Sequence, residues 1–318
     1  MAPRVLITGA TGFIGRRVVA TAVARADLGH LRLLVRSAAA GEEPEAYDNP
    51  LTETVIGDLR DPDSLRRACE GVDVLIHCAS AIGGDEDLLH AVNDDGTRAL
   101  VDAAVRAGVT RIVALSTASV HGRGPFRGAA PGTLPLAPGS ATSRTRAAGE
   151  RYVMDAGGAV LRPHLVYGAG DRQLIPGLVR LLDALPGPLD AGASLHSLID
   201  VDSLAGALLG AAFSPRTEAG AYYVNHPEPV PVAELLAPCE ELLAVQTGRS
   251  RAAAVDLAEA HELLAGHPFG RHHLAMLATD HWFADDRPWR ELGCDPGPGF
   301  TAGFAAHARW YRDLLGPS

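Results

Sequence analysis

The chain has no lysine. All 28 basic residues among its 318 are arginines. This absence excludes any mechanism that needs a lysine amine, such as a Schiff base or the phosphate-binding lysine of a P-loop. Alanine, glycine, proline and arginine are abundant, which suggests a GC-rich coding bias that could replace surface lysines. A catalytic lysine could not be replaced in this way without effect, because guanidinium and ammonium groups differ in geometry and acidity.

Other absences limit the partners and the cellular location. The four cysteines are too widely spaced to suggest a zinc site or a disulfide framework, and we expect free thiols: Cys69, Cys78, Cys239 and Cys294. The net charge of −10 argues against a nucleic-acid partner. No apolar run is long enough to span a bilayer, so no membrane partner is expected. Because the chain begins directly with a strand pattern, we expect a cytoplasmic protein; its oligomeric state stays open.

The N-terminal segment carries the strongest positive signal. The apolar run Val5–Ile7 precedes Thr8-Gly9-Ala10-Thr11-Gly12-Phe13-Ile14-Gly15, and 16–26 then has a helical pattern. A strand, a glycine turn and a helix N-terminus together form an anion site, since free N–H groups and the helix dipole both favour negative charge. We therefore predict a dinucleotide site here. The alternative is a glycine turn that merely packs tightly.

Strand and helix patterns alternate through the first half of the chain. Apolar runs indicate strands at 31–35, 54–57, 72–78, 111–115 and 159–162, and helical patterns lie between them at 62–70, 88–107 and 143–155. This alternation predicts an α/β fold with a doubly wound parallel sheet. The Gly/Pro-rich segment 122–139 is expected to be a loop beyond the carboxyl end of a strand, where such sheets place their ligands. The region after residue 226 looks mostly helical, ending in an amphipathic helix that docks.

Several motifs in this order resemble the extended type of the short-chain dehydrogenase/reductase superfamily. The resemblance rests on Thr8–Gly15, Gly57–Asp61, His77–Ser80, Val92–Thr97, Leu161–Gly168, Ile199–Asp202, Glu291–Gly293 and Trp310–Tyr311. It implies a Rossmann domain over 1–163, to which segments near 195–225 return, and a substrate-binding region over 164–194 and 226–318. It also implies cofactor contacts from Gly9, Thr11, Gly12, Phe13, Ile14, Gly15, Asp58, Leu59, Ala79 and Arg146.

Arg36 decides between the two nicotinamide cofactors. It lies at the end of the second predicted strand, where an enzyme that prefers NAD has an acidic residue for the ribose hydroxyls. A guanidinium at this place suits the 2′-phosphate of NADP through charge and bidentate geometry. We therefore predict NADP (as NADPH), with acceptance of NADH left open. The alternative is that Arg36 is simply an exposed residue at a strand end.

The proton-transfer residues of the superfamily are missing. The resemblance places Thr117 at the catalytic Ser/Thr position and His121 where a tyrosine usually follows. Alignment on Gly149-Glu150 puts Thr142 in the slot of the catalytic tyrosine and Arg146 in that of the lysine. A threonine hydroxyl is too weak an acid to replace the tyrosine, and Arg146 stays charged, although it could still bind the ribose.

Three proton sources then remain open: a local side chain, solvent, or the substrate itself. Among local side chains, His121 has a suitable pKa, but a structural role for it is an equal alternative. A substrate hydroxyl ortho or peri to the ketone already places a proton beside the developing oxyanion. We favour this third source, assisted by Thr117.

These observations predict an NADPH-dependent ketoreductase for a ketone of a polycyclic aromatic, polyketide-type metabolite, with a role in antibiotic biosynthesis. A non-catalytic NADP-binding sensor or scaffold is the first alternative. A nucleotide-sugar epimerase or dehydratase comes last, because transient sugar oxidation needs the missing base. No metal site is predicted, since the histidines of the C-terminal half share no acidic or cysteine partner at metal-binding spacing: His267, His272, His273 and His281.

Overall fold

A parallel sheet of seven strands forms the centre of the described chain. The computed structural model describes residues 2–25, 29–37, 49–248 and 253–316. The strand order is β12-β7-β5-β4-β1-β2-β3, and all neighbours are parallel. The strands are β1 Val5–Thr8, β2 Leu31–Val35, β3 Thr52–Ile56, β4 Val74–His77, β5 Arg111–Leu115, β7 Ala159–Arg162 and β12 Gly220–Tyr223. The predicted doubly wound sheet is confirmed.

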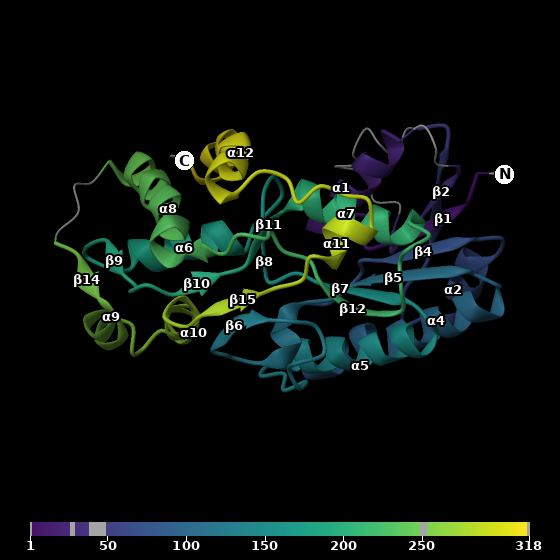
Figure 1. The fold of residues 1–318 in the computed structure, drawn as a ribbon, viewed down its shortest axis with the longest axis horizontal. Coiled ribbons are helices and arrows are strands. Elements are labelled where there is room, and N and C mark those ends of the chain that lie inside the picture. The colour runs from purple at the N-terminus through teal and green to yellow at the C-terminus, as the bar shows by residue number, and fades with distance from the viewer. Residues whose placement is uncertain (1, 26–28, 38–48, 249–252, 317–318) are drawn as a thin grey trace.

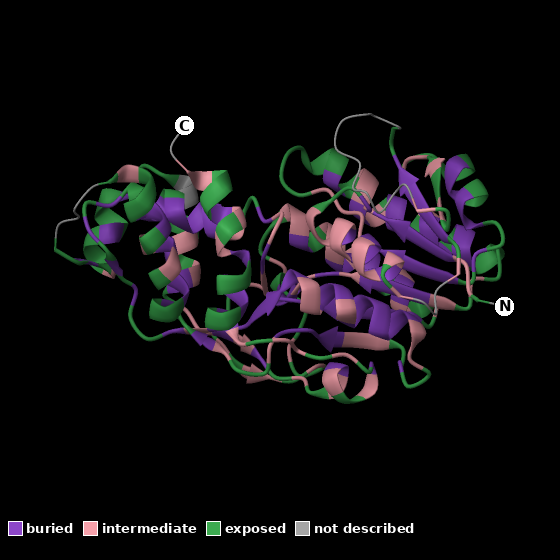
Figure 2. Cartoon of the chain, turned by 90° about the horizontal axis from the view of Figure 1, so that it is seen from above, coloured by how far each residue is buried: buried purple, intermediate pink, exposed green. Residues whose placement is uncertain are grey.

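Helices cover both faces of this sheet (Figure 1). On one face lie α1 Phe13–Val23 and α7 Val201–Phe213, and on the other lie α2 Pro62–Cys69, α4 Gly96–Arg106 and α5 Ala141–Asp155. The inner strands are buried on both sides (Figure 2), which explains why they appear in the sequence as continuous apolar runs. Side chains cap the helix starts: Asp61 caps α2, Asp200 caps α7, and a Ser140–Ser143 capping box begins α5.

Two predicted helices differ in detail from the structure. The helix expected over 88–107 consists of α3 Glu86–Leu89, a π-helical turn at His90–Asp95 and α4. The wider turn places Asn93 toward the interior, where it is buried. Helix α1 ends at Val23, and the predicted end at residue 26 lies outside the described residues.

The smaller C-terminal part mixes helices with short strands, and the prediction of a mostly helical region missed the strands. Its helices are α6 Leu174–Asp183, α8 Val232–Thr247, α9 Leu257–Leu263, α10 Pro268–Leu277, α11 Arg287–Glu291 and α12 Phe300–Leu315. A four-stranded sheet has the order β13-β10-β15-β6, with β13 Val230–Pro231, β10 Leu195–His196, β15 His281–Phe283 and β6 Phe126–Ala129. Two further pairs are β8 Leu165–Tyr167 with β11 Leu198–Asp200, and β9 Leu189–Asp190 with β14 Val255–Asp256.

The segment 122–139 is more than a loop. It contains β6, which pairs in parallel with β15 from the far end of the chain. The pairing partner is more than 150 residues away, so local sequence could not indicate this strand. The boundaries of the Rossmann domain and of the substrate-binding region, as given from the sequence, stay a prediction.

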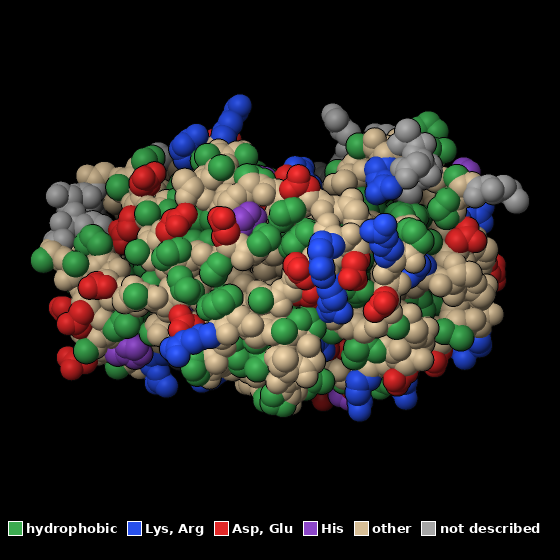
Figure 3. Space-filling model, in the orientation of Figure 1, with side chains coloured by type: hydrophobic (Ala, Val, Ile, Leu, Met, Phe, Trp, Pro, Cys, Tyr) green, Lys and Arg blue, Asp and Glu red, His purple; other side chains and the backbone are tan. Residues whose placement is uncertain are grey.

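The surface is mixed in charge. On the face shown in Figure 3, arginine and acidic side chains are interspersed. Within the described residues, no helix is long and apolar enough to cross a membrane.

Candidate active site

The glycine turn after β1 has the backbone geometry that a pyrophosphate needs. Gly9 has φ +72°, and a Cβ there would lie 2.5 Å from the backbone nitrogen of Ala79. A Cβ on Gly15 would lie 2.0 Å from the Gly9 carbonyl oxygen, so neither position accepts a side chain. Gly12 begins α1 without a side-chain cap, and the first turn holds no acidic residue. The N–H groups at the start of α1 are thus left for an anion, and the turn fits a dinucleotide.

A cleft of about 1130 Å³ opens from this turn, between the carboxyl ends of the sheet strands and the C-terminal part. Seven of the predicted cofactor residues line it: Gly9, Thr11, Gly12, Phe13, Ile14, Gly15 and Arg146. Ala79 instead lines an adjoining cavity of about 20 Å³. Asp58, Leu59 and Arg36 lie outside the walls of both.

The residues expected around the adenosine form a charged group at the ends of β2 and β3. Arg60 donates to Asp58 through Nε (3.0 Å to Oδ1) and Nη2 (2.8 Å to Oδ2). These bonds, together with the nearby positive charge of Arg36, lower the pKa of Asp58 to about 2. Arg36 itself is exposed directly after β2, whereas Leu59 is buried. Arg36 is therefore placed where a ligand could reach its guanidinium.

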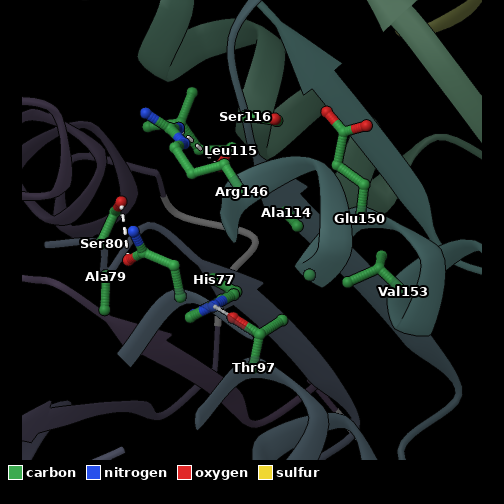
Figure 4. A pocket seen from close by; sticks show the side chains of 12 residues that line it. His77, Ala79, Ser80, Thr97, Ala114, Leu115, Ser116, Arg146, Glu150 and Val153 are labelled. Carbon is green, nitrogen blue, oxygen red and sulfur yellow. Dashed lines mark hydrogen bonds between the residues drawn. The ribbon is translucent and has the colours of Figure 1, made fainter. Parts of the chain in front are cut away.

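Two polar networks hold the strand ends and the loop after β4. His77 bonds Thr8 Oγ1 through Nδ1 (2.7 Å) and Thr97 Oγ1 through Nε2 (3.0 Å), which ties β4 to β1 and α4. Asn93 accepts from Ser80 Oγ (3.1 Å) and donates to Thr145 Oγ1 (3.1 Å). The bond between His77 and Thr97 is drawn in Figure 4. Through Asn93, the π-helical turn fixes the loop at the cleft against α5.

Two of the three residues in the catalytic slots line the cleft, and the third does not. Thr117 lines the cleft; its Oγ1 caps a short turn by accepting from Ser119 N (3.1 Å) and lies 3.2 Å from Ser119 Oγ. Thr142 Oγ1 accepts from Gly83 N (3.3 Å), and Thr142 is not among the residues that line the cleft. Arg146 Nη2 donates to the Leu115 carbonyl oxygen (3.0 Å; Figure 4). Arg146 thus puts a cation on the cleft wall beside the end of β5.

The structure does not bring His121 to the cleft. It is buried, its Nδ1 lies 2.8 Å from the Pro135 carbonyl oxygen, and its Nε2 lies 2.8 Å from Tyr223 Oη. Burial lowers the pKa of His121. The same Nε2 lies 3.3 Å from Arg162 Nη1, and Arg162 forms a buried bidentate ion pair with Glu150 (2.5 and 3.0 Å). Both ring nitrogens are engaged, so the histidine connects a buried polar network beneath the site.

The cleft walls include residues that sequence reasoning missed. An apolar set comes from β8, α6, α10 and α12: Leu165, Val166, Leu174, Met276 and Trp310. Ser116 also lines the cleft, and its Oγ is buried without a hydrogen-bond partner among the described residues. His164 lies on the same wall, and its place at a strand end allows a role in the substrate pocket to be predicted. No tyrosine is found among the described residues that line the cleft. The position of β8 after a sheet strand and the amphipathic C-terminal helix were the available signals for this wall.

Comparison with solved structures supports the fold. The crystal structure of gox2253 superposes with a TM-score of 0.76, covers 99% of this chain and 100% of that chain, and shares 24% identity. UDP-glucuronic acid 4-epimerase from Bacillus cereus, solved in complex with NAD, gives a TM-score of 0.74 at 17% identity, with 98% and 99% of the chains covered.

Two characterised relatives are reductases by name. The chain is 29% identical to 2-alkyl-3-oxoalkanoate reductase of Stenotrophomonas maltophilia, over 92% of this chain and 94% of the relative. It is 31% identical to the 4-hydroxy-2-methyl-3-oxo-4-farnesyl-3,4-dihydroquinoline-1-oxide ketoreductase of Stigmatella aurantiaca, over 73% of this chain and 71% of the relative.

Residues 6–230 match the 3-beta hydroxysteroid dehydrogenase/isomerase family, for which an NAD(P) cofactor is typical. This match covers the glycine turn, the central sheet apart from Val5, and the cleft residues up to β12. The chain therefore belongs to the 3-beta hydroxysteroid dehydrogenase/isomerase family and is an NAD(P)-dependent oxidoreductase of the extended short-chain dehydrogenase/reductase type.

Proposed function

We propose that this protein is an NADPH-dependent ketoreductase whose substrate is a polycyclic aromatic ketone, such as an angucyclinone, with a hydroxyl group ortho or peri to the carbonyl. One observation carries the proposal. The cleft joins the glycine turn, Thr117 and an apolar wall, yet its described lining contains no tyrosine. The apolar wall favours a broad, apolar substrate, and the missing tyrosine favours one that provides its own proton.

The residues at the cofactor end of the cleft support the choice of NADPH as the cofactor. When bound, this cofactor supplies the hydride to the carbonyl carbon. The start of α1 would hold its pyrophosphate, and Arg146 would hydrogen-bond the nicotinamide ribose from the wall of the cleft. The exposed guanidinium of Arg36 after β2 would pair with the 2′-phosphate.

The proton must come from a group other than the usual tyrosine. A general acid contributes roughly 10²–10⁴-fold, and a substrate hydroxyl that is already hydrogen-bonded to the ketone would replace this contribution. It would transfer its proton to the carbonyl oxygen and recover one from water. Thr117 Oγ would donate a hydrogen bond to the same oxygen and so fix the carbonyl beside the cofactor.

The relatives support a ketone substrate. The name of the Stigmatella enzyme describes a quinoline with a ketone and a hydroxyl at neighbouring ring positions. The apolar residues from β8, α6, α10 and α12 give this cleft a wall suited to a ring system of that kind.

The test uses a matched pair of ketones: a peri-hydroxy tetralone, or a larger polycyclic analogue, and its methyl ether. Oxidation of NADPH is followed by absorbance with each ketone. We expect turnover of the hydroxy ketone and a rate at least about 100-fold lower for the ether, because the methyl group removes the proton. Equal rates for the two ketones would contradict the proposed proton path.

Two variants separate the roles of the threonines. Thr142→Val should keep kcat within about 3-fold, because its hydroxyl accepts a backbone N–H outside the cleft. Thr117→Val should lower kcat by roughly 10–100-fold through loss of one hydrogen bond to the oxyanion. If NADPH binds but neither ketone of the pair is reduced, the alternative function as a non-catalytic sensor or scaffold is favoured. Turnover of a nucleotide sugar would favour the epimerase or dehydratase.

A further inference from the structure

Three histidines from distant parts of the sequence meet behind the wall of the cleft. His164 precedes β8, His196 ends β10 and His281 begins β15. His196 and His281 are register partners in the parallel pair β10–β15, so their side chains project from the same face of that sheet. Leu165 N donates to the Ser197 carbonyl oxygen (3.3 Å), which holds His164 beside them. Figure 1 shows β8, β10 and β15 meeting where the two parts of the molecule join.

The three rings converge without bonding to one another. One ring nitrogen of each lies within 4.8 Å of one nitrogen of both others. The ring planes are within 15° of parallel, and the centroids are 5.3, 6.1 and 6.3 Å apart. In a tetrahedral zinc site, with bonds of about 2.0–2.1 Å, the nitrogen ligands lie about 3.4 Å apart. To bind one ion, the nitrogens would move inward and the near-parallel rings would tilt until their in-plane lone pairs point to one place.

The hydrogen bonds of His281 and His196 leave lone pairs free. His281 Nδ1 lies 2.8 Å from the Thr279 carbonyl oxygen, which can only accept, so Nδ1 carries the proton and Nε2 is bare. Ser194 Oγ donates to the Leu277 carbonyl oxygen. His196 Nε2 lies 3.1 Å from that hydroxyl oxygen and therefore donates to it, which leaves His196 Nδ1 bare. A histidine that binds a metal usually donates its other ring N–H to a hydrogen-bond acceptor, which fixes the tautomer and the orientation of the ring. The carbonyl and hydroxyl partners of His281 and His196 are acceptors of this kind.

Two ring nitrogens of the three-histidine cluster are buried and make no hydrogen bond within the described chain: His164 Nε2 and His196 Nδ1. A histidine binds a metal through such a bare ring nitrogen. An unsatisfied buried polar atom is costly, and an ion that bonds to both would remove this cost.

We propose that His164, His196 and His281 bind one divalent transition-metal ion of the Zn²⁺ type. Three imidazoles and no carboxylate suit Zn²⁺, Ni²⁺ or Cu²⁺ and disfavour Mg²⁺ and Ca²⁺, which prefer oxygen ligands. Three protein ligands also leave a fourth position for water. Because the ligands come from three segments, the ion would cross-link β10, β15 and the cleft wall at His164.

The experiment measures metal binding by the tag-free full-length protein. After removal of metals and dialysis against one equivalent of Zn²⁺, elemental analysis should find one zinc per chain. The thermal unfolding midpoint should rise by about 5 °C at saturating Zn²⁺ and not with Mg²⁺. Loading with Co²⁺ should produce the strong visible absorption of a four-coordinate nitrogen site. None of these measurements depends on ketone reduction.

Two variants localise the site. His196→Asn should weaken Zn²⁺ binding by at least about 100-fold and abolish the Co²⁺ band, while His30→Gln, at an exposed histidine, should change neither. Unchanged circular dichroism and NADPH binding would show that the variant is folded; if it is not, His281→Gln takes its place. Wild-type protein that keeps no zinc, or a His196→Asn variant that binds it equally well, would overturn the proposal.

Discussion

At the residue scale, the chemistry of the site depends on a few positions where this sequence differs from the superfamily pattern, above all Thr142 and Arg146 in the slots of the tyrosine and the lysine. The glycines at 9 and 15 could be predicted as cofactor residues because of their spacing in a turn between a strand and a helix. The structure adds that neither position accepts a Cβ. The choice between a catalytic and a structural role for His121 could not be made from the sequence. Its partners, Tyr223 and Arg162, come from strands that only the folded sheet brings together.

Arg36 should set the cofactor preference. Arg36→Ala should raise the Kd of NADPH by roughly 10–100-fold, because a hydrogen bond to a charged group contributes about 1.5–3 kcal/mol. The Kd of NADH should change by less than about 3-fold. Isothermal titration of both cofactors measures this, with the exposed Arg106→Ala as the matched control. Equal losses for the two cofactors would show that Arg36 does not contact the 2′-phosphate.

His121 should matter for stability and little for catalysis. His121→Asn leaves Tyr223 Oη and the Pro135 carbonyl without their partner, and it should lower the free energy of unfolding by about 1–3 kcal/mol. The kcat for the hydroxy ketone should stay within about 3-fold, since His121 lies outside the cleft lining. Urea unfolding and steady-state kinetics test the two expectations together. A folded variant with a 100-fold lower kcat would assign the proton transfer to His121.

At the element scale, apolar periodicity predicts the sheet well and long-range pairing poorly. Strands such as Val74–His77 are buried on both faces, so their composition alone reveals them. The strand at Phe126–Ala129 exists because β15 pairs with it, and no local pattern encodes that partner. The sequence does not indicate the π-helical turn at His90–Asp95 either. This turn directs Asn93 toward the loop at Ser80 and Ala81, which is distant in the sequence.

The junction of β1, β4 and α4 at His77 should be sensitive to acid. Burial lowers the pKa of His77 from 6.5 to about 4, so the unfolded chain takes up the proton first as the pH falls. The stability contributed by neutral His77 is complete above pH 6.5 and is lost toward pH 4, by up to about 1.4 kcal/mol per pH unit.

Denaturant unfolding of His77→Gln measures this contribution against the wild type. The difference in unfolding free energy should be largest at pH 7 and should shrink toward pH 4. His30→Gln is the exposed control and should follow the wild-type curve. A difference for His77→Gln that is independent of pH would show that folding does not lower the pKa of His77.

At the scale of the whole molecule, the site forms where the two parts of the chain meet. The glycine turn and Thr117 belong to the central sheet, while Met276 and Trp310 come from the C-terminal helices. The cofactor half could be predicted because it lies on consecutive elements of a regular alternation. For the substrate wall, the sequence indicated only the region, and its individual residues could not be predicted. The three-histidine cluster could not be predicted either, since the wall and the cluster are each assembled from segments that are far apart in sequence.

The most direct test of the central claim is a crystal structure of the protein with NADP and a peri-hydroxy polycyclic ketone. It would show which group lies within about 3.2 Å of the carbonyl oxygen, the reach that a proton donor needs. We predict that the substrate hydroxyl and Thr117 Oγ both lie within this distance of the carbonyl oxygen. An ionisable protein side chain at that distance, with the substrate hydroxyl pointing away, would contradict the account.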